Sequence, residues 1–323
     1  MKLAVGFITF NSGTAIYLPY FLDSLFKALA TWPEEKLKIL AIDNSDEEDN
    51  HNQDYVAEFI NRTQALVDFE WSGVNLGFSK SYNWMISKAA DWGADYFLMI
   101  NPDTVIDPQA INLLVAALEA NQGWGSVAPK IKRWDFEKLQ LTNYLDSCGL
   151  KMATGLHFFD LGQGELDEKQ YDQAEILGPS GAAALFRLTA LTAVREATGY
   201  LDERFFMYKE DCDLAYRLNK AGYPCHFVPE ALVYHDRTVA TPGRGFKKRL
   251  ASRRARSRKV RSWSFINQHL LFFKHWSDQG AKDKLIIISK VLKMALWVLI
   301  LEPFLLKDYK KINELRRVPT SFR

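Results

Sequence analysis

The chain has 323 residues, a formal net charge of +2 and 48% hydrophobic residues, so it can build a sizeable core and is not mainly disordered. Its three cysteines are an odd number without metal-binding spacing. This pattern argues against a secreted disulfide framework and favours a reducing, cytosolic environment. The apolar run at residues 3–10 lacks the length of a secretory signal, so we expect a buried strand there and no signal peptide.

Short β-rich runs alternate with longer helical segments through the first hundred residues. We expect strands at residues 3–9, 38–43, 67–71 and 96–100, and helices at residues 16–31, 54–64 and 79–92. Such alternation predicts a mostly parallel sheet flanked by helices, which is an α/β fold. Further along, we expect a helix at 108–121, a strand at 125–129, an exposed loop at 160–175, an apolar segment at 176–187, a helix at 210–221 and a strand at 225–234.

Polar residues follow four of the predicted strands at the point where each strand ends. They are Thr9 and Asn11, then Asp43, then Asn75 and Gly77, and finally Asn101 and Asp103. Ligands of open α/β sheets bind beyond the carboxyl ends of the strands. We therefore expect these strand ends to converge on one crevice.

Asn101 and Asp103 flank a proline directly after an aliphatic strand. Oxygen ligands at this spacing suit Mg²⁺ or Mn²⁺, which also take water and substrate phosphates as ligands. The alternative is a simple turn in which Asp103 caps the next segment. His235 ends another apolar strand, where it is either a further metal ligand or a structural histidine.

An acidic cluster of Glu210, Asp211 and Asp213 opens a predicted helix just after an aromatic stretch. Acidic residues in a first helical turn are ordinary dipole partners, which accounts for at least one of the three. A carboxylate beside aromatic rings is also a candidate general base for a sugar hydroxyl. Asp43 is equally open to two interpretations, a hydrogen bond to a nucleoside or a local turn.

Glycines and missing motifs narrow the candidate chemistry further. Gly77 and Gly181 either let the backbone approach a ligand closely or only permit turns. The sequence contains neither a Walker-type loop nor a Gly-x-Gly-x-x-Gly dinucleotide motif.

Taken together and in this order, these segments resemble the family 2 glycosyltransferases of the GT-A fold, especially bacterial rhamnosyltransferases. The matching segments are residues 5–11, 41–45, 75–79, 101–104, 178–181 and 202–214. The resemblance covers residues 1–240 and is specific as an ordered set, although each segment alone is not.

The resemblance implies a role for each matching position. It places the nucleoside at Thr9, Asn11 and Asp43, and the sugar nucleotide near Asn75 and Gly77. It places the metal-bound diphosphate at Asn101 and Asp103, with His235 completing the metal site. It makes Asp211 the base and puts Gly181 and Glu210 at the acceptor. Many relatives have Asp where this chain has Asn101. That departure implies a metal held more weakly or through water.

The expected reaction is inverting transfer of a sugar, with rhamnose as one candidate, from a dTDP or UDP donor to a glycan or lipid-linked acceptor in cell-surface polysaccharide synthesis. The base removes the acceptor's proton while the cation stabilises charge on the departing diphosphate. One alternative is a sugar nucleotidyltransferase, against which the missing Gly-rich, basic N-terminal loop counts. The other is a non-catalytic basic module that binds lipid or nucleic acid.

The C-terminal region is strongly basic and then apolar. Residues 237–276 hold twelve Arg or Lys residues and no Asp or Glu. Nucleic-acid binding is one interpretation. We favour membrane binding, because an apolar stretch at residues 285–306, interrupted by Lys290 and Lys293, is typical of a helix lying in the bilayer interface.

These patterns predict a catalytic domain at residues 1–240 and a basic, amphipathic helical extension at residues 241–323. The extension would hold the enzyme on the cytosolic face of the plasma membrane without binding nucleic acid. The alternative is that these helices pack on the catalytic domain or form a homo-oligomer interface.

Overall fold

The computed structural model describes residues 1–47, 50–237, 251 and 253–320. The strands are β1 (Leu3–Thr9), β2 (Leu37–Asp43), β3 (Val67–Trp71), β4 (Tyr96–Ile100), β5 (Thr104–Ile106), β6 (Ser126–Asp135), β7 (Gln140–Ser147), β8 (Leu150–Ala153), β9 (His157–Asp160), β10 (Ala183–Arg187) and β11 (Cys225–His235). The helices are α1 (Asn11–Ala15), α2 (Leu18–Leu29), α3 (Asn52–Thr63), α4 (Phe78–Asp91), α5 (Ala110–Ala120), α6 (Leu188–Ala193), α7 (Glu210–Lys220), α9 (Arg258–Lys274), α10 (Ala281–Leu301) and α11 (Asp308–Leu315), with 3-10 turns η1 (Glu34–Lys36) and η2 (Pro303–Lys307).

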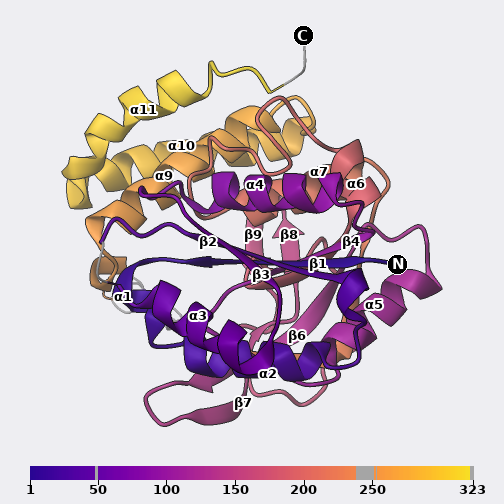
Figure 1. Ribbon diagram of the computed structural model, residues 1–323. Helices are drawn as coiled ribbons and strands as arrows, with labels where there is room; N and C mark the ends of the chain where they lie inside the picture. Colours follow the sequence, from indigo (N-terminus) through magenta and orange to yellow (C-terminus); the bar gives the residue numbers. More distant parts are fainter. Residues whose placement is uncertain (48–49, 238–250, 252, 321–323) are drawn as a thin grey trace.

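A nine-stranded sheet forms the centre of the protein (Figure 1). Eight strands follow the order β3-β2-β1-β4-β10-β6-β11-β5, and β7 pairs with β6. Strands β3, β2, β1 and β4 are parallel to their neighbours, whereas β10 runs antiparallel between β4 and β6. The predicted α/β fold is confirmed, and the predicted strands at 67–71 and 96–100 coincide with β3 and β4.

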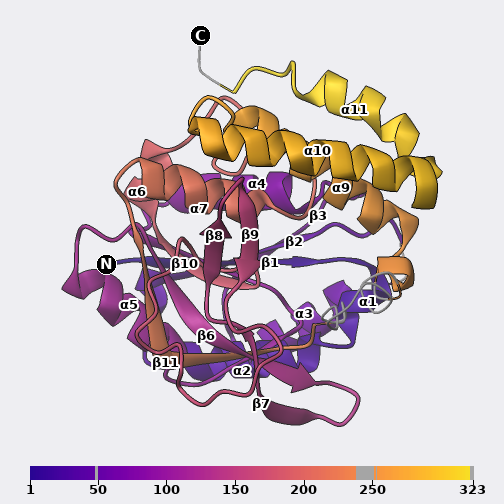
Figure 2. The ribbon, with the colours of Figure 1, turned by 180° about the vertical axis from the view of Figure 1, so that it is seen from behind.

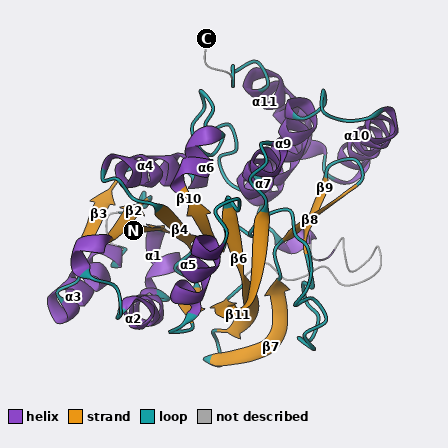
Figure 3. Ribbon diagram, turned by 90° about the vertical axis from the view of Figure 1, so that its right-hand side faces the viewer, coloured by secondary structure: helices purple, strands orange, loops and turns teal. Residues whose placement is uncertain are grey.

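Helices cover both faces of this sheet, because each presents one apolar side to it. On one face, buried side chains of α2, α3 and α5 pack against β1, β2 and β4. On the other face, α4, α6 and α7 contribute a second core that includes Tyr82, Leu191 and Leu214. Figure 3 shows α9, α10 and α11 stacked outside α7, on the side remote from α2.

Residues 140–160 form strands that the sequence analysis did not predict. Strand β7 pairs with β6, and β8 and β9 form a separate hairpin that lies beside α9 and α10 (Figure 2). Exposed residues alternate irregularly in these strands, so they carry no clear period. The expected exposed loop at 160–175 is partly wrong, because the side chain of Asp167 is only 7% exposed and pairs with Lys130 at 3.1 Å and Lys132 at 2.8 Å.

The C-terminal helices pack on the catalytic part of the chain. Phe265, Leu270 and Leu271 of α9 share a buried cluster with Phe205 and with Cys212 of α7. This packing is the alternative that the sequence analysis left open for these helices. The expected boundary at residue 240 and the basic run at residues 247–249 lie outside the described residues.

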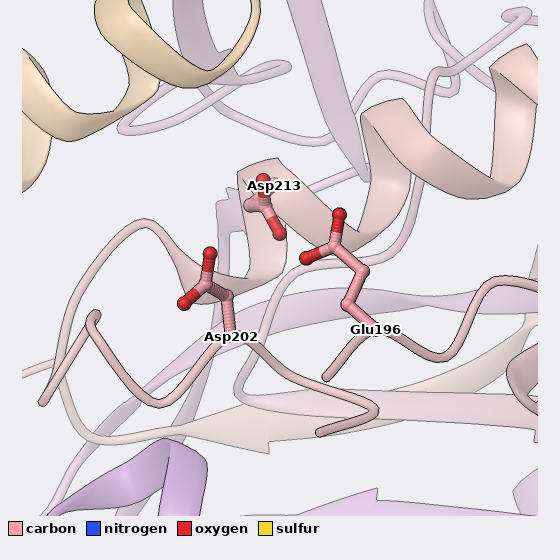
Figure 4. A group of neighbouring side chains, drawn as sticks. All are labelled: Glu196, Asp202 and Asp213. Carbon is pink, nitrogen blue, oxygen red and sulfur yellow. The ribbon is translucent and has the colours of Figure 1, made fainter. Parts of the chain in front are cut away.

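A buried ionic network joins α9 to the rest of the fold. The carboxylates of Glu196, Asp202 and Asp213 have ligand atoms within 4.8 Å of one another (Figure 4). The amino group of Lys274 in α9 donates to all three, at 2.6, 2.8 and 2.9 Å. His275 adds a fourth contact, 2.8 Å from Asp213. The Lys274 ammonium offsets the charge of this acidic cluster together with Arg204, which pairs with Asp202, and Arg217, which pairs with Asp213.

No helix in the described ranges combines the length and apolar character needed to cross a bilayer.

We predict that Lys274→Met lowers the free energy of unfolding by about 3–5 kcal/mol, because it removes a buried cation that contacts all three carboxylates. Urea unfolding followed by circular dichroism measures this change. The matched control is Lys220→Met, which removes a pair with Asp278 in which the lysine is 60% exposed. We expect the control to lose less than about 1 kcal/mol. Equal losses in the two variants would contradict a specific role for the buried network.

Candidate active site

Strand pairing brings Asp103 beside His235. Asp103 immediately precedes β5, and β5 pairs antiparallel with the end of β11, so that Thr104 lies opposite His235. The backbone N–H of Asp236 donates to the carbonyl of Asp103 at 2.9 Å, which fixes the two segments together. His235 Nε2 lies 3.3 Å from Asp103 Oδ2.

The other nitrogen of His235 contacts a residue that the sequence analysis missed. His235 Nδ1 lies 2.8 Å from Asp146 Oδ2, and Arg237 contacts the second oxygen of Asp146 at 3.0 Å. Arg237 also pairs with Asp160 at 3.1 Å. Asp146 and Asp160 come from β7 and β9, in the stretch where the sequence shows no clear period. Only the long-range strand pairing of β7 with β6 reveals Asp146.

The carboxylates around His235 favour a positive charge on its imidazole ring. Burial lowers the pKa of His235, but the carboxylates of Asp103 and Asp146 outweigh it and raise that pKa to about 10. Burial raises the pKa of Asp146, while the His235 and Arg237 contacts bring it below its usual range. Two carboxylates thus face one imidazole in a buried setting.

These residues fit a divalent cation. The Oδ1 atom of Asp103 is buried and has no hydrogen-bond partner among the described residues. A carboxylate oxygen and an imidazole nitrogen are suitable ligands for Mn²⁺ or Mg²⁺, although Mg²⁺ favours oxygen more strongly. Asp146 orients the ring by holding Nδ1, as carboxylates commonly do for metal-binding histidines.

The start of α7 brings Asp211 to the same cavity. The backbone N–H groups of Gly181 and Cys212 donate to the two oxygens of Asp211, at 3.2 and 2.7 Å. A Cβ atom at Gly181 would lie 3.4 Å from Asp211 Oδ2, so the absence of a side chain keeps the carboxylate accessible. The result is a carboxylate oriented by backbone donors at a helix N-terminus.

Glu210, the neighbour of Asp211, lies in a different environment. It is only 5% exposed, and its Oε2 atom has no hydrogen-bond partner among the described residues. Burial and the nearby Asp211 charge raise the pKa of Glu210 well above its usual range. The neutral acid is therefore favoured at Glu210.

Six predicted site residues line one cavity of about 460 Å³. They are Asn101, Asp103, Gly181, Glu210, Asp211 and His235. Phe78, Asp146, Asp160, Arg237 and Arg256 also line it. The cavity therefore combines a cation-favouring pair, an oriented carboxylate and two guanidinium groups.

The other predicted residues form a second cluster at the ends of β1 and β2, outside that lining. Thr9 and Asp43 are opposite each other in register, and the Thr9 hydroxyl donates to Asp43 Oδ1 at 2.9 Å. The same oxygen accepts a hydrogen bond from the N–H of Ser45 at 3.2 Å. This bond forms the local turn that was the alternative interpretation of Asp43. Asn11 is held to this turn, since its N–H donates to Ser45 Oγ at 2.7 Å.

Gly77 joins this cluster to the cavity. The side chain of Asn75 accepts the N–H of Gly77 at 2.9 Å, and Gly77 has a φ of +79°. A Cβ atom at Gly77 would lie 2.5 Å from the carbonyl oxygen of Phe206. Glycine is thus required by close packing against the segment before α7, and the next residue, Phe78, lines the cavity. Nucleotide binding by these residues stays a prediction.

Comparison with known sequences agrees with this arrangement. The model of the family described as "Glycosyltransferase like family 2" matches residues 18–259. The chain is also 30% identical over 260 residues to the N-acetylglucosaminyl-diphospho-decaprenol L-rhamnosyltransferase of Mycobacterium tuberculosis. That match covers 74% of this chain and 77% of the relative.

Solved structures share the fold at low identity. A mannosyltransferase from Pyrobaculum calidifontis, in complex with GDP-Man and Mn²⁺, has a TM-score of 0.56 at 14% identity, over 96% of this chain and 73% of that one. TarS of S. aureus has a TM-score of 0.53 at 15% identity, over 90% of this chain. The present chain spans 43% of TarS, which is less than half its length.

The family match over most of the chain, the rhamnosyltransferase relative and the shared GT-A architecture agree, so the chain belongs to the glycosyltransferase-like family 2 and is a glycosyltransferase.

Proposed function

We propose that the protein transfers a sugar, with rhamnose as the leading candidate, from a dTDP or UDP donor to a lipid-linked acceptor during cell-surface polysaccharide synthesis. The observation that carries this proposal is the presence of Asp211 and the Asp103–His235 pair on one cavity. The name of the mycobacterial relative, which joins a diphospho-decaprenol acceptor to rhamnosyl transfer, supports the choice of sugar and acceptor.

Asp103 and His235 would hold a divalent cation, Mn²⁺ or Mg²⁺. When bound, such an ion stabilises negative charge on the diphosphate leaving group. The fit of the two side chains supports this assignment, and so does Mn²⁺ in the complex of the structurally similar mannosyltransferase. Asn101 lines the same cavity and offers an amide in place of a second carboxylate.

Asp211 is the proposed base. Its carboxylate accepts the proton of the acceptor hydroxyl while that oxygen bonds to the anomeric carbon and the nucleoside diphosphate leaves from the opposite face. This single displacement inverts the anomeric configuration. The two backbone N–H donors that orient Asp211 support this role over Glu210, whose neutral form cannot accept a proton.

The remaining assignments are those that the family resemblance implies. Thr9, Asn11 and Asp43 would bind the nucleoside, with Asn75 and Gly77 beside the sugar nucleotide. Gly181 and Glu210 would lie at the acceptor.

Exposed apolar side chains on α10 support peripheral binding to the cytosolic face of the membrane. Leu285, Leu292, Leu296 and Leu299 are each more than half exposed. A second copy of the chain is the other candidate partner for this surface.

We predict that Glu210→Gln retains activity within about tenfold of the wild type, because glutamine matches the shape and charge of the neutral acid. Asp211→Asn should lose about 10²- to 10⁴-fold, the usual contribution of a general base. Release of nucleoside diphosphate from a donor panel, with the lipid-linked acceptor present, measures both. A larger loss in Glu210→Gln would reverse the two roles, and release of pyrophosphate would indicate a nucleotidyltransferase.

We also predict that Asp146→Asn raises the Mn²⁺ concentration needed for half-maximal activity by about 10- to 100-fold, because it releases the ring of His235. Asp103→Ala should stay inactive at every Mn²⁺ concentration. The control is Asp172→Asn, which removes a pair with Lys130 outside the cavity and should leave the Mn²⁺ dependence unchanged. An unaltered Mn²⁺ dependence in Asp146→Asn would reject the proposed metal site.

A further inference from the structure

A second cavity, also of about 460 Å³, lies between the β8–β9 hairpin and helices α9 and α10. One wall is apolar and consists of Phe158 from β9, Phe265 from α9, and Met294 and Trp297 from α10. Figure 2 shows the hairpin beneath these two helices. Such a wall suits a hydrocarbon chain.

Three cations line the same cavity: Lys209, Arg253 and Lys293. Arg253 is paired with Glu302 at 2.7 Å. Lys209 and Lys293 have no carboxylate within ion-pair distance in the part of the chain that the structure describes. Two uncompensated ammonium groups beside an apolar wall fit an anion attached to a hydrocarbon chain.

The second cavity adjoins the active-site cavity. Phe158, Lys209 and Ser264 line both. Lys209 is two residues from Asp211 in the sequence and lines both cavities, so the segment that carries the proposed base also reaches the second cavity. A ligand that extends from one cavity to the other passes Lys209.

The backbone at Lys209 is strained, and α9 holds it in place. Tyr208 and Lys209 have φ values of +74° and +71°, which non-glycine residues rarely adopt. The buried side-chain amide of Asn267 in α9 donates to the carbonyls of Met207 and Tyr208, at 2.8 and 2.7 Å. The C-terminal helices thus fix the segment that places Lys209 at the junction.

The exposed side of α10, away from this cavity, carries a further apolar surface. Leu285, Ile288, Leu292, Leu296 and Leu299 are exposed and follow helical spacing, so they form one stripe along the helix. Met294 and Trp297 of the same helix line the cavity.

We propose that this second cavity binds the phosphate-bearing end of the lipid-linked acceptor. The phosphate groups contact Lys209 and Lys293, the first units of the hydrocarbon chain pack on Phe158, Phe265 and Met294, and the acceptor sugar reaches Asp211. The rest of the lipid's hydrocarbon chain follows the exposed apolar stripe of α10 into the bilayer. This inference rests on the proposed transfer to a lipid-linked acceptor.

Binding of farnesyl diphosphate to the full-length chain, measured by calorimetry, tests the site without relying on activity. Lys209→Gln and Lys293→Gln should each weaken binding by about 10- to 100-fold, as expected for loss of a charged contact to phosphate. Met294→Glu should weaken it as well, because it places a negative charge on the apolar wall. The matched control is Lys282→Gln, an exposed lysine of the same helix outside the cavity lining, which should bind as the wild type does.

Two further probes separate the halves of the ligand. Inorganic pyrophosphate and farnesol should each bind at least about tenfold more weakly than farnesyl diphosphate, because each lacks one of the two contacts. Equal binding of pyrophosphate, or unchanged binding in both lysine variants, would overturn the inference.

The outcomes also separate this inference from the proposed function. If sugar is transferred to a lipid-linked acceptor but farnesyl diphosphate binds equally well to the Lys209 and Lys293 variants, the inferred binding site is wrong and the proposed function holds. If the probe binds as expected but no lipid-linked acceptor is glycosylated, the proposed function is wrong and the binding site holds.

Discussion

The contact of one imidazole with two carboxylates is the constraint on which the active site depends. His235 ends β11, Asp103 precedes β5 and Asp146 lies near the end of β7, so their contacts require three strands to be in correct register. Burying this much charge is unfavourable unless each group is paired. The structure meets that requirement and leaves one oxygen of Asp103 unpartnered, where a cation is favourable. The geometry of this candidate metal-binding pair therefore depends on the pairing of the strands.

The C-terminal helices contribute to the same site from the opposite side. Lys274 contacts the carboxylates of Glu196, Asp202 and Asp213, and Asn267 holds the backbone that leads into α7. Both residues belong to α9, which is followed by the partly exposed α10. Helix α9 contacts the segment before Asp211, and α10 carries an exposed apolar stripe. Part of this basic and apolar region thus packs on the catalytic part of the chain, and part of it forms exposed apolar surface.

The sequence was informative where structure is local, and uninformative where it depends on distant partners. Strands β3 and β4 follow from their own residues. Asn101, Asp103 and His235 share one cavity because they follow or end strands of one sheet, whereas Thr9 and Asp43, at the ends of β1 and β2, lie outside its lining. Asp146 escaped prediction because its position depends on pairing between β6 and β7. Nor does an acidic pair reveal which member is buried, so the contrast between Glu210 and Asp211 emerges only from the folded chain.

Gly77 is a further position at which the structure depends on a distant part of the chain. Its lack of a side chain allows the carbonyl of Phe206 to approach, and the N–H of Phe78 donates to that carbonyl at 2.7 Å. The loop after β3 and the segment before α7 are therefore fastened together. Any larger residue at Gly77 pushes on a segment that ends, a few residues later, at Asp211. A substitution at Gly77 should consequently displace the segment that leads to Asp211, so two loops of the candidate site depend on the hydrogen atom that glycine carries in place of a side chain.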